Sequence, residues 1–216
     1  AENLRASDVG KIRVAATPAF GVDLLPTAVA GYLAAHADTV FEIETLHHDE
    51  ISTALLESRI DIGLAFDSVT VPGLTSETLA RGEFVVIAPP GLELGPGDSV
   101  SVDALAAQRF IGLSARGPLG GLLTSYIENS DVTFEQVVYT ETYHIAKALV
   151  ARGSGISIVD TITARSGQAD KVRTWALEPP LHYSIDVISS DSMPPSLLCR
   201  RFIEHLGEVI RAFVAN

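Results

Sequence analysis

The sequence of 216 residues predicts an α/β protein with two subdomains, between which the chain crosses twice. Apolar residues alternate between the strand period of about two and the helix period of about 3.6 along residues 12–67, and again along residues 102–159. A Pro- and Gly-rich stretch at residues 89–97 separates these two repeats. Alternating strands and helices are typical of parallel sheets covered by helices, so each repeat is expected to form its own α/β subdomain.

The two crossovers divide the sequence into three segments. We expect residues 11–88 and 164–216 to form subdomain I, and residues 89–163 to form subdomain II. Residues 1–10 show little periodicity and form a polar lead-in. Two lobes joined in this way make a clamshell. Its cleft is expected where strand ends of both lobes meet, because ligands of open α/β sheets bind at the carboxyl ends of the strands.

The first repeat predicts three parallel strands connected by two helices. The strands are expected at residues 12–16, 41–46 and 60–66, and the helices at residues 24–33 and 51–55. Thr17-Pro18 supplies a possible N-cap and first-turn proline for the first helix. A right-handed βαβαβ unit places the carboxyl ends of its strands on one edge. Besides the loop at residues 46–49, the candidate ligand-binding residues on this edge are Thr17, Pro18, Ala19, Phe20, Phe66 and Asp67.

Two strands at residues 74–79 and 83–88 precede the Pro-Gly break, and the second repeat follows it. Its expected elements are a helix at 102–107 capped by Ser101, strands at 110–113, 134–139 and 156–159, and helices at 119–128 and 142–152. In the last of these helices one apolar face is predicted to be buried, made of Ile145, Ala146, Leu149 and Val150.

The chain then returns to subdomain I. A short helix at residues 160–166 and strands at 172–177 and 182–189 lead to a terminal helix. One side of the terminal helix is apolar and is expected to pack on subdomain I through Leu198, Phe202, Leu206, Val209 and Phe213.

Three helix starts are candidates for binding an anion. Free N–H groups and the positive end of the helix dipole attract negative charge at such positions. They fall at residues 17–20, 116–119 and 142–144. If they converge, Thr17, Thr142 and Arg116 would supply two hydroxyls and a guanidinium to a carboxylate. The alternative is that both threonines are plain N-caps and that Arg116 is a solvated surface residue.

Two acids end strands and are candidates for a cationic group of the same ligand. Asp67 and Asp160 would face the cleft from opposite lobes, although each acid could instead cap a turn or a helix. Phe20, Phe66 and Tyr143 could form apolar walls, and Phe66 equally fits the core. The sequence therefore predicts a ligand with both a carboxylate and a cationic nitrogen.

Three segments together resemble the effector-binding domain of LysR-type transcriptional regulators: LLPTAVAGYLAAH, LHHDEISTALLESRIDIGLAF and IAKALVARGSGISIV. They carry a Leu-Pro opening of the first long helix, an RxDxG-like strand start and a segment similar to LVxxGxGIxxxP. The resemblance runs from about residue 11 to residue 213. Asp160-Thr161 stands where many relatives have proline, so the loop there departs from the family pattern.

This resemblance implies a periplasmic-binding-protein-like (type 2) clamshell that binds a small-molecule effector. It also implies a winged helix-turn-helix upstream, with residues 1–10 as the end of its linker, and a cytoplasmic homodimer or homotetramer that contacts DNA only through the missing domain. The His47-His48 loop and the Ile-Val-Asp-Thr ending are similar to the amino-acid- and opine-sensing branch. The family's polar contact in this loop falls nearest His48.

Composition excludes several other functions. A net charge of −12, from 27 acidic and 15 basic residues, argues against nucleic-acid binding by this chain alone. The single Cys199 excludes an internal disulfide and is expected to be a buried thiol. No run approaches the roughly 18 apolar residues of a membrane helix. The histidine pair has no third ligand at a recognisable spacing, so no metal is expected.

No cofactor or catalytic signature is recognisable either. Gly153-Ser154-Gly155 precedes a strand, whereas a phosphate-binding loop follows one. We therefore expect a sensor of a small polar anionic or zwitterionic metabolite, with amino-acid derivatives favoured, and not an enzyme. The alternative is an exported solute-binding protein of a transporter, which shares the clamshell architecture; an enzyme on this scaffold is a third possibility.

Overall fold

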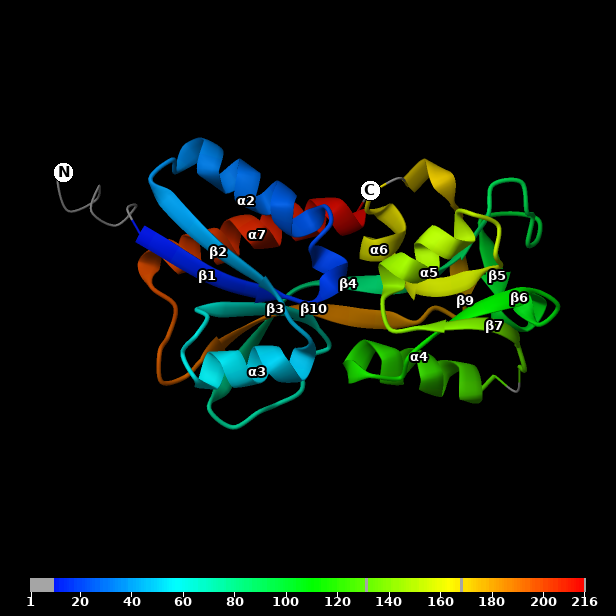
Figure 1. Ribbon diagram of the computed structural model, residues 1–216, viewed down its shortest axis with the longest axis horizontal. Coiled ribbons are helices and arrows are strands. Elements are labelled where there is room, and N and C mark those ends of the chain that lie inside the picture. The colour runs from blue at the N-terminus through cyan, green and yellow to red at the C-terminus, as the bar shows by residue number, and fades with distance from the viewer. Residues whose placement is uncertain (1–9, 131, 168, 216) are drawn as a thin grey trace. The chain divides into compact units, whose positions relative to one another are not determined.

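A computed structural model describes residues 10–130, 132–167 and 169–215 (Figure 1). The chain forms two compact units: unit 1 contains the residues up to Arg81 and from Ser184 onward, and unit 2 is Gly82–Tyr183. The sequence-based division has the same two-segment pattern but places the crossovers at 88/89 and 163/164. Residues 1–9 of the expected linker end lie outside the described residues, and Gly10 already belongs to the first strand.

Unit 1 begins with the predicted βαβαβ repeat. Strands β1 (Gly10–Ala16), β2 (Thr39–Thr45) and β3 (Ile62–Phe66) are connected by helices α2 (Leu24–Ala35) and α3 (His48–Leu56). The central strand β1 pairs in parallel with both others. All residues of β3 are buried, as expected for a covered parallel strand.

The first helix does not begin at Thr17 as predicted. Pro18–Phe20 form a single 3-10 turn (η1), and α2 begins only at Leu24 after Gly21 and Asp23. Pro26 then lies in the first turn of α2, where a missing N–H leaves no helical hydrogen bond unmade. The predicted helix start at residues 17–20 is therefore wrong, and a single turn offers no helix dipole to an anion.

The remaining elements of unit 1 come from the far end of the chain. Strand β10 (His182–Ser190) pairs antiparallel with β3, and α7 (Leu197–Ala215) contacts α2 and β1. The sheet order continues from β10 to β4 (Leu74–Ala88).

The two strands predicted at 74–79 and 83–88 are one strand, β4. Gly82 lies within it, and a Cβ atom there would come within 2.5 Å of the Tyr183 hydroxyl. The glycine therefore permits close approach of a neighbouring side chain and does not mark a turn. The boundary between the compact units falls inside this continuous strand, so the sequence gives no break at that point.

Unit 2 repeats the arrangement of unit 1 with different residues. Strands β6 (Arg109–Leu113) and β7 (Glu135–Thr140) pair in parallel, and Phe110 bridges in parallel to Ile156, just before β8 (Ser157–Asp160). Strand β8 pairs antiparallel with β4, which also pairs with β9 (Arg173–Glu178). The other elements are β5 (Ser99–Ser101), η2 (Val102–Leu105), α4 (Gly117–Glu128), α5 (Tyr143–Val150), α6 (Thr161–Arg165) and η3 (Ala169–Lys171).

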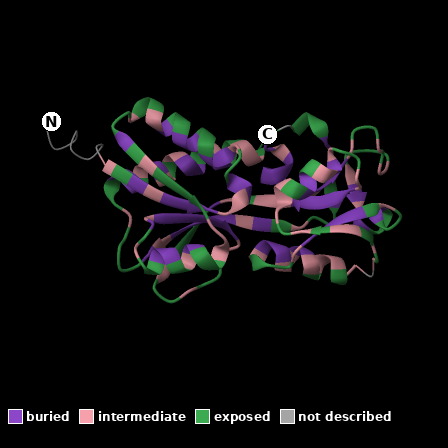
Figure 2. Ribbon diagram, in the orientation of Figure 1, coloured by how far each residue is buried: buried purple, intermediate pink, exposed green. Residues whose placement is uncertain are grey.

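Buried residues line both the strands and the inward helix faces (Figure 2). In α7, Leu198, Phe202 and Leu206 are buried as predicted, and Ile210 is buried where Val209 and Phe213 are only partly covered. Cys199 is a buried thiol, as predicted, and burial together with nearby Asp61 raises its pKa to about 12.

The prediction for α5 is wrong at one position. Ile145 is 51% exposed, whereas Lys147 is buried beside Ala146 and Val150. The Lys147 ammonium donates hydrogen bonds to the carbonyl oxygens of Ala164 (2.9 Å) and Ser166, at the end of α6. A lysine whose ammonium finds two carbonyl acceptors can therefore take the place of an apolar residue in the contact between α5 and α6.

Candidate functional site

In unit 1 the carboxyl ends of the three parallel strands lie in a row, as the sequence predicts. The Thr17 N–H donates to the Leu64 carbonyl at 3.1 Å, which ties the end of β1 to β3. The Leu46 N–H donates to the Ala16 carbonyl at 3.1 Å, which ties the loop after β2 to β1. The loops that carry Thr17, His48 and Asp67 therefore start from neighbouring strands.

Thr17 presents a hydroxyl that the protein does not use. Its backbone carbonyl accepts the Phe20 N–H, but its side chain makes no capping hydrogen bond. The Oγ1 atom is buried and has no hydrogen-bond partner among the described residues. The plain N-cap interpretation of Thr17 is therefore wrong, and its buried hydroxyl is one of the few unpaired polar atoms among the described residues.

The residues after Thr17 are mostly structural. Phe20 is completely buried and stacks on Phe66, with ring centroids 4.4 Å apart. Pro18 and Ala19 complete the single turn that carries this ring, and Ala19 is buried. Of the predicted apolar walls, Phe20 and Phe66 thus pack against each other.

His48 opens α3 and has a second unused polar atom. Its Nε2 is buried and has no hydrogen-bond partner among the described residues. Burial lowers the pKa of His48, although Asp49 and Asp186 partly oppose this, so the neutral imidazole is favoured. His47, the preceding residue, has a structural role. Its N–H donates to the Glu50 carboxylate at 2.7 Å in a capping interaction.

Asp67 has the left-handed backbone conformation, with φ of 40°, and is held by β10. Its Oδ1 accepts the Ser184 N–H at 2.7 Å and the Ser184 hydroxyl at 3.0 Å. The Asp67 N–H donates back to the Ser184 carbonyl. These contacts agree with the alternative prediction, in which Asp67 stabilises a turn.

Sequence reasoning missed Asp186, a buried acid in the strand next to Asp67. Its carboxylate accepts hydrogen bonds from the Ser68 N–H and hydroxyl, the Thr78 hydroxyl and the Ser184 hydroxyl, at 2.7 to 2.9 Å. Burial alone would raise the pKa of Asp186, but these hydrogen bonds outweigh it and leave the pKa below its ordinary value. The one signal in the sequence was an acid inside an otherwise apolar strand, Ile185-Asp186-Val187.

Unit 2 has an equivalent row of strand ends. The Ser114 N–H donates to the Thr140 carbonyl at 3.0 Å, which joins the loops after β6 and β7. The Ser157 hydroxyl donates to the Ile111 carbonyl at 2.8 Å, which fixes β8 beside β6. The loops with Arg116 and Thr142 and the end of β8 at Asp160 therefore start from neighbouring strands.

Arg116 is the N-cap residue of α4, in the position predicted for a helix start. Its N–H donates to the Ser114 hydroxyl at 3.2 Å, and the side chain is exposed. Gly117 has φ of 74° and is followed by Pro118 at the start of the helix. The loop is packed so closely that a Cβ on Gly120 would lie 2.3 Å from the Ser114 carbonyl oxygen. Arg116 thus stands at the N-terminus of α4, whose first amides have no partner within the helix.

Thr142 and Tyr143 form the start of α5. The Thr142 hydroxyl makes no capping hydrogen bond, so the plain N-cap interpretation is wrong here too. The Tyr143 hydroxyl is buried and lacks a partner among the described residues. Burial, followed by the nearby Asp160 charge, raises the pKa of Tyr143, so the phenol is protonated and able to donate.

Asp160 is completely buried at the junction of β8 and α6. Its Oδ1 accepts the Thr163 N–H at 2.8 Å, so it caps α6 as the alternative prediction stated. Its Oδ2 has no hydrogen-bond partner among the described residues. Burial raises the pKa of Asp160, and the capping contacts and His144 offset only part of this effect. One carboxylate oxygen therefore caps the helix while the other is unused.

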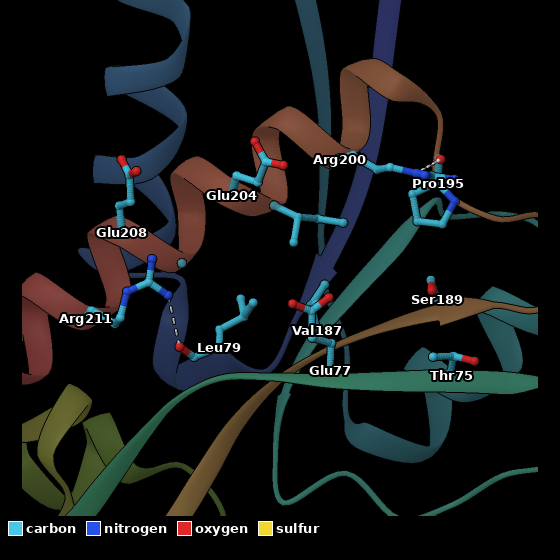
Figure 3. Close-up of a pocket in the computed structure, with 12 residues that line it drawn as sticks. Thr75, Glu77, Leu79, Val187, Ser189, Pro195, Arg200, Glu204, Glu208 and Arg211 are labelled. Carbon is cyan, nitrogen blue, oxygen red and sulfur yellow. Dashed lines mark hydrogen bonds between the residues drawn. The ribbon is translucent and has the colours of Figure 1, made fainter.

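A hollow of about 670 Å³ also lies in unit 1, but it is not the predicted site (Figure 3). None of the eleven predicted binding residues lines it. Its wall on α7 carries Arg200, Glu204, Glu208 and Arg211, and its floor includes Leu79 of β4. Arg211 donates to the Leu79 carbonyl at 3.3 Å and Arg200 to the Pro195 carbonyl at 3.0 Å. Both arginines thus already have acceptors within the protein.

Two kinds of site are not found in the part of the chain that the structure describes. No three or more His, Cys, Asp or Glu side chains gather there in a way that could hold a metal ion. None of the helices described there has the length and apolar character needed to cross a membrane.

The fold and the strand-end residues define a two-unit α/β ligand-binding domain. Residues 5–211 match the family model described as LysR substrate binding domain. The transcriptional regulator DgcR of Pseudoalteromonas sp. is 31% identical over 97% of this chain and 72% of its own length. This chain therefore spans roughly three quarters of that relative.

Solved structures agree on the fold. The regulatory domain of Synechocystis PCC6803 CcmR, in complex with 2-PG, superimposes with a TM-score of 0.79 and 16% identity, covering 93% of this chain and 97% of that one. The effector-binding domain of QuiR, in complex with shikimate, gives 0.76 and 20%, covering 94% and 98%. The predicted periplasmic-binding-protein-like fold class is confirmed.

The chain belongs to the LysR substrate binding domain family, the effector-binding domain of LysR-type transcriptional regulators. The family resemblance expected from the sequence is thereby confirmed. DgcR is named as a transcriptional regulator, which agrees with the prediction of a regulatory and not an enzymatic domain.

Proposed function

We propose that this domain senses a small polar anionic or zwitterionic metabolite, with amino-acid-like molecules favoured, for a LysR-type regulator. The residues proposed to bind the effector are Thr17 and His48 in unit 1, and Arg116, Thr142, Tyr143 and Asp160 in unit 2. Binding shifts the protein toward one of two states, which requires that the effector has a different affinity for each state.

One observation carries this proposal. Six buried side-chain nitrogen or oxygen atoms lack a hydrogen-bond partner among the described residues. Four of them belong to strand-end residues already predicted to bind ligand: Thr17, His48, Tyr143 and Asp160. Buried polar atoms are rarely left unpaired, because each carries a desolvation penalty of about 1–3 kcal/mol. A polar ligand that reaches these atoms would remove that penalty.

The chemistry of the strand-end residues in each unit favours a ligand with a carboxylate. In unit 2, Arg116 stands beside the first amides of α4, and α5 begins at Tyr143 in the neighbouring loop. Guanidinium and helix N-termini both bind carboxylates well. In unit 1, the Thr17 hydroxyl and the neutral His48 imidazole each can donate or accept. The ligands of CcmR and QuiR, 2-PG and shikimate, are also small molecules.

A thermal-shift screen against amino acids, opines and benzoates tests the proposal. We expect amino acids or opines to raise the melting temperature, and titration calorimetry to give one site per chain for the best compound. Arg116→Ala should weaken that binding about tenfold or more, because a charge-assisted contact contributes about 1.5–3 kcal/mol. The exposed arginine Arg152, whose guanidinium donates to the Ala148 carbonyl of the preceding helix, gives the control Arg152→Ala. The proposed ligand class would be contradicted if only benzoates shifted the melting temperature. It would also be contradicted if Arg116→Ala bound the best compound as tightly as the control does.

The action of the whole regulator is part of the same proposal. A helix-turn-helix domain outside this chain would contact DNA, in a cytoplasmic homodimer or homotetramer. Exposed apolar side chains on two strands fit the dimer: Val40 and Ile43 on β2, and Tyr139 on β7, are 57%, 48% and 70% exposed. We expect light scattering to show a dimer or larger assembly that Ile43→Asp weakens, whereas a monomeric wild-type chain would contradict it.

The rival function is an exported solute-binding protein of a transporter. The two functions differ in the gene upstream of this domain, where a helix-turn-helix segment supports the regulator and a signal peptide supports the transporter. Unchanged mass of the bound compound after incubation would dismiss turnover by an enzyme.

A further inference from the structure

Three of the unpaired buried atoms belong to unit 2, on β8, on α6 and on α5, which packs against both. They are Asp160 Oδ2, Tyr143 OH and Thr163 Oγ1. Thr163 is completely buried and was not among the residues predicted from the sequence. Thr163 donates its N–H to Asp160 Oδ1 at 2.8 Å, and α5, which begins at Tyr143, packs against both β8 and α6. The three side chains thus come from elements that pack together, and we call them the polar cluster of unit 2. None of the three atoms has a hydrogen-bond partner among the described residues.

The polar groups next to this cluster include His144, Tyr183 and Lys147. His144 on α5 favours the ionised form of Asp160. The Tyr183 hydroxyl accepts the Thr161 N–H at 3.1 Å. The ammonium of Lys147 bonds to the carbonyls at the other end of α6. The cluster is thus an acid with a spare oxygen, flanked by two hydroxyls and set in low-dielectric surroundings.

We propose that this cluster is the amine subsite of the effector site, where Asp160 Oδ2 accepts a hydrogen bond from a protonated amine and the Tyr143 and Thr163 hydroxyls complete its coordination. The inference rests on the proposed function and narrows it: the effector is a zwitterion with a cationic nitrogen, and simple carboxylate anions are rejected. A second anion near Asp160 would meet like-charge repulsion in low dielectric. An ammonium supplies a positive charge and up to three donors, which match one carboxylate oxygen and two hydroxyl oxygens.

The effect of burial on Asp160 supports this assignment. Burial raises its pKa, so the ionised form is disfavoured relative to a carboxylate in water. A cation in contact with Oδ2 would favour the ionised form and lower this pKa. The same acid keeps its structural role, because Oδ1 remains on the Thr163 N–H.

Matched compounds test the inference on the wild-type domain. The pairs are alanine and propionate, glutamate and glutarate, and phenylalanine and 3-phenylpropionate, each differing by the α-amine alone. We expect the amine-containing member of the pair that binds best to bind about tenfold to a hundredfold tighter, the effect of one charge-assisted hydrogen bond. Equal binding of both members would overturn the amine subsite and leave the sensor function standing. A screen in which no amino acid, opine or acid binds would instead remove the proposed function and the subsite together.

Variants assign the preference to particular atoms. Asp160→Asn keeps the acceptor for the Thr163 N–H, and it should lower the preference for the amine to about onefold to threefold. Thr163→Val and Tyr143→Phe should each reduce the preference by a smaller factor, about threefold to tenfold, and Thr163→Ser should restore it. Asp170→Asn changes an exposed acid of the same unit and should leave the preference unchanged. If Asp160→Asn retains the full preference for the amine, Asp160 has no role in binding it. The same conclusion follows if the control Asp170→Asn loses as much of the preference as Asp160→Asn does.

Discussion

The two units build the same arrangement of strand ends but treat the acid at its edge differently. In both, three parallel strand ends lie in a row and an acid follows or ends the third strand: Asp67 in unit 1 and Asp160 in unit 2. The Asp67 carboxylate accepts both polar hydrogens of Ser184, whereas one oxygen of Asp160 has no partner among the described residues. Topology therefore places the acid, and the neighbouring strand decides how many of its hydrogen bonds are made within the fold.

The two units also differ in the pKa of their buried acids, Asp186 in unit 1 and Asp160 in unit 2. Burial pushes the pKa upward for both Asp186 and Asp160. Hydrogen bonds from Ser68, Thr78 and Ser184 reverse that effect at Asp186, but burial prevails at Asp160. Ionised Asp186 therefore stabilises the folded protein, and ionised Asp160 destabilises it, which is the pattern expected when binding sites are built at some expense of stability.

The largest effect is expected from removing the well-paired acid. Asp186→Ala should lower the free energy of unfolding by about 3 kcal/mol, because several donors lose a charged acceptor in a buried place. Urea unfolding at pH 7 measures this, with the exposed Asp38→Ala of the same unit as a control expected to stay within about 0.5 kcal/mol. Because the folded pKa of Asp186 is depressed, its contribution is fully present above the ordinary value of 3.8 and is lost as the pH falls through the folded pKa. If Asp186→Ala lost no more stability than Asp38→Ala, the hydrogen bonds to Asp186 would be dispensable for folding.

A second prediction concerns the well-paired buried charge of unit 2. Lys147→Met preserves most of the volume but removes the donor that the carbonyls of Ala164 and Ser166 share. We expect a loss of about 2 kcal/mol in the same unfolding experiment, since two buried acceptors lose a donor. The exposed Lys171→Met should have almost no effect. A neutral Lys147→Met would mean that unit 2 does not depend on this charge.

Neutralising the unpaired acid should have the opposite sign. Asp160→Asn is expected to raise the free energy of unfolding at pH 7 by about 1 kcal/mol, because it removes a desolvated charge while retaining the cap on α6. The folded pKa of Asp160 is raised, so the penalty is absent below the unfolded value near 3.8 and grows as the pH rises toward the folded pKa. The advantage of the variant should therefore disappear in thermal melts at low pH. Destabilisation at pH 7 would contradict this electrostatic interpretation of Asp160.

The smallest effect on stability is expected at Thr17, the unpaired hydroxyl of unit 1. Thr17→Val should change the free energy of unfolding by less than about 0.5 kcal/mol, since no hydrogen bond to a described residue is lost. Thr78→Val in the same unit removes the 2.7 Å hydrogen bond to Asp186 and should cost about 1 kcal/mol. For binding of the best amino acid or opine the order reverses, and Thr17→Val should weaken it severalfold more than Thr78→Val. Equal effects on binding would exclude Thr17 from the site.

The sequence by itself determined the local part of this protein. Apolar periodicity gave the strands and helices of both repeats, and the parallel strand ends gave the rows that carry Thr17, His48, Arg116 and Asp160. These features depend on residues a few positions apart, whose spacing the sequence shows directly. Even the cap that Asp160 places on α6 joins residues only three apart.

Only the tertiary structure decided which polar atoms are satisfied. The donors to Asp186 come from Ser68, Thr78 and Ser184, on three separate segments, and Lys147 is buried because the end of α6 supplies its acceptors. The exposed Ile145 beside it shows that periodicity cannot tell which helix face meets a neighbour. A hydrogen bond requires both partners within about 3 Å, and for these pairs the fold alone creates that proximity. The unpaired atoms that define the proposed site are therefore a property of the packed structure and cannot be read from the chain.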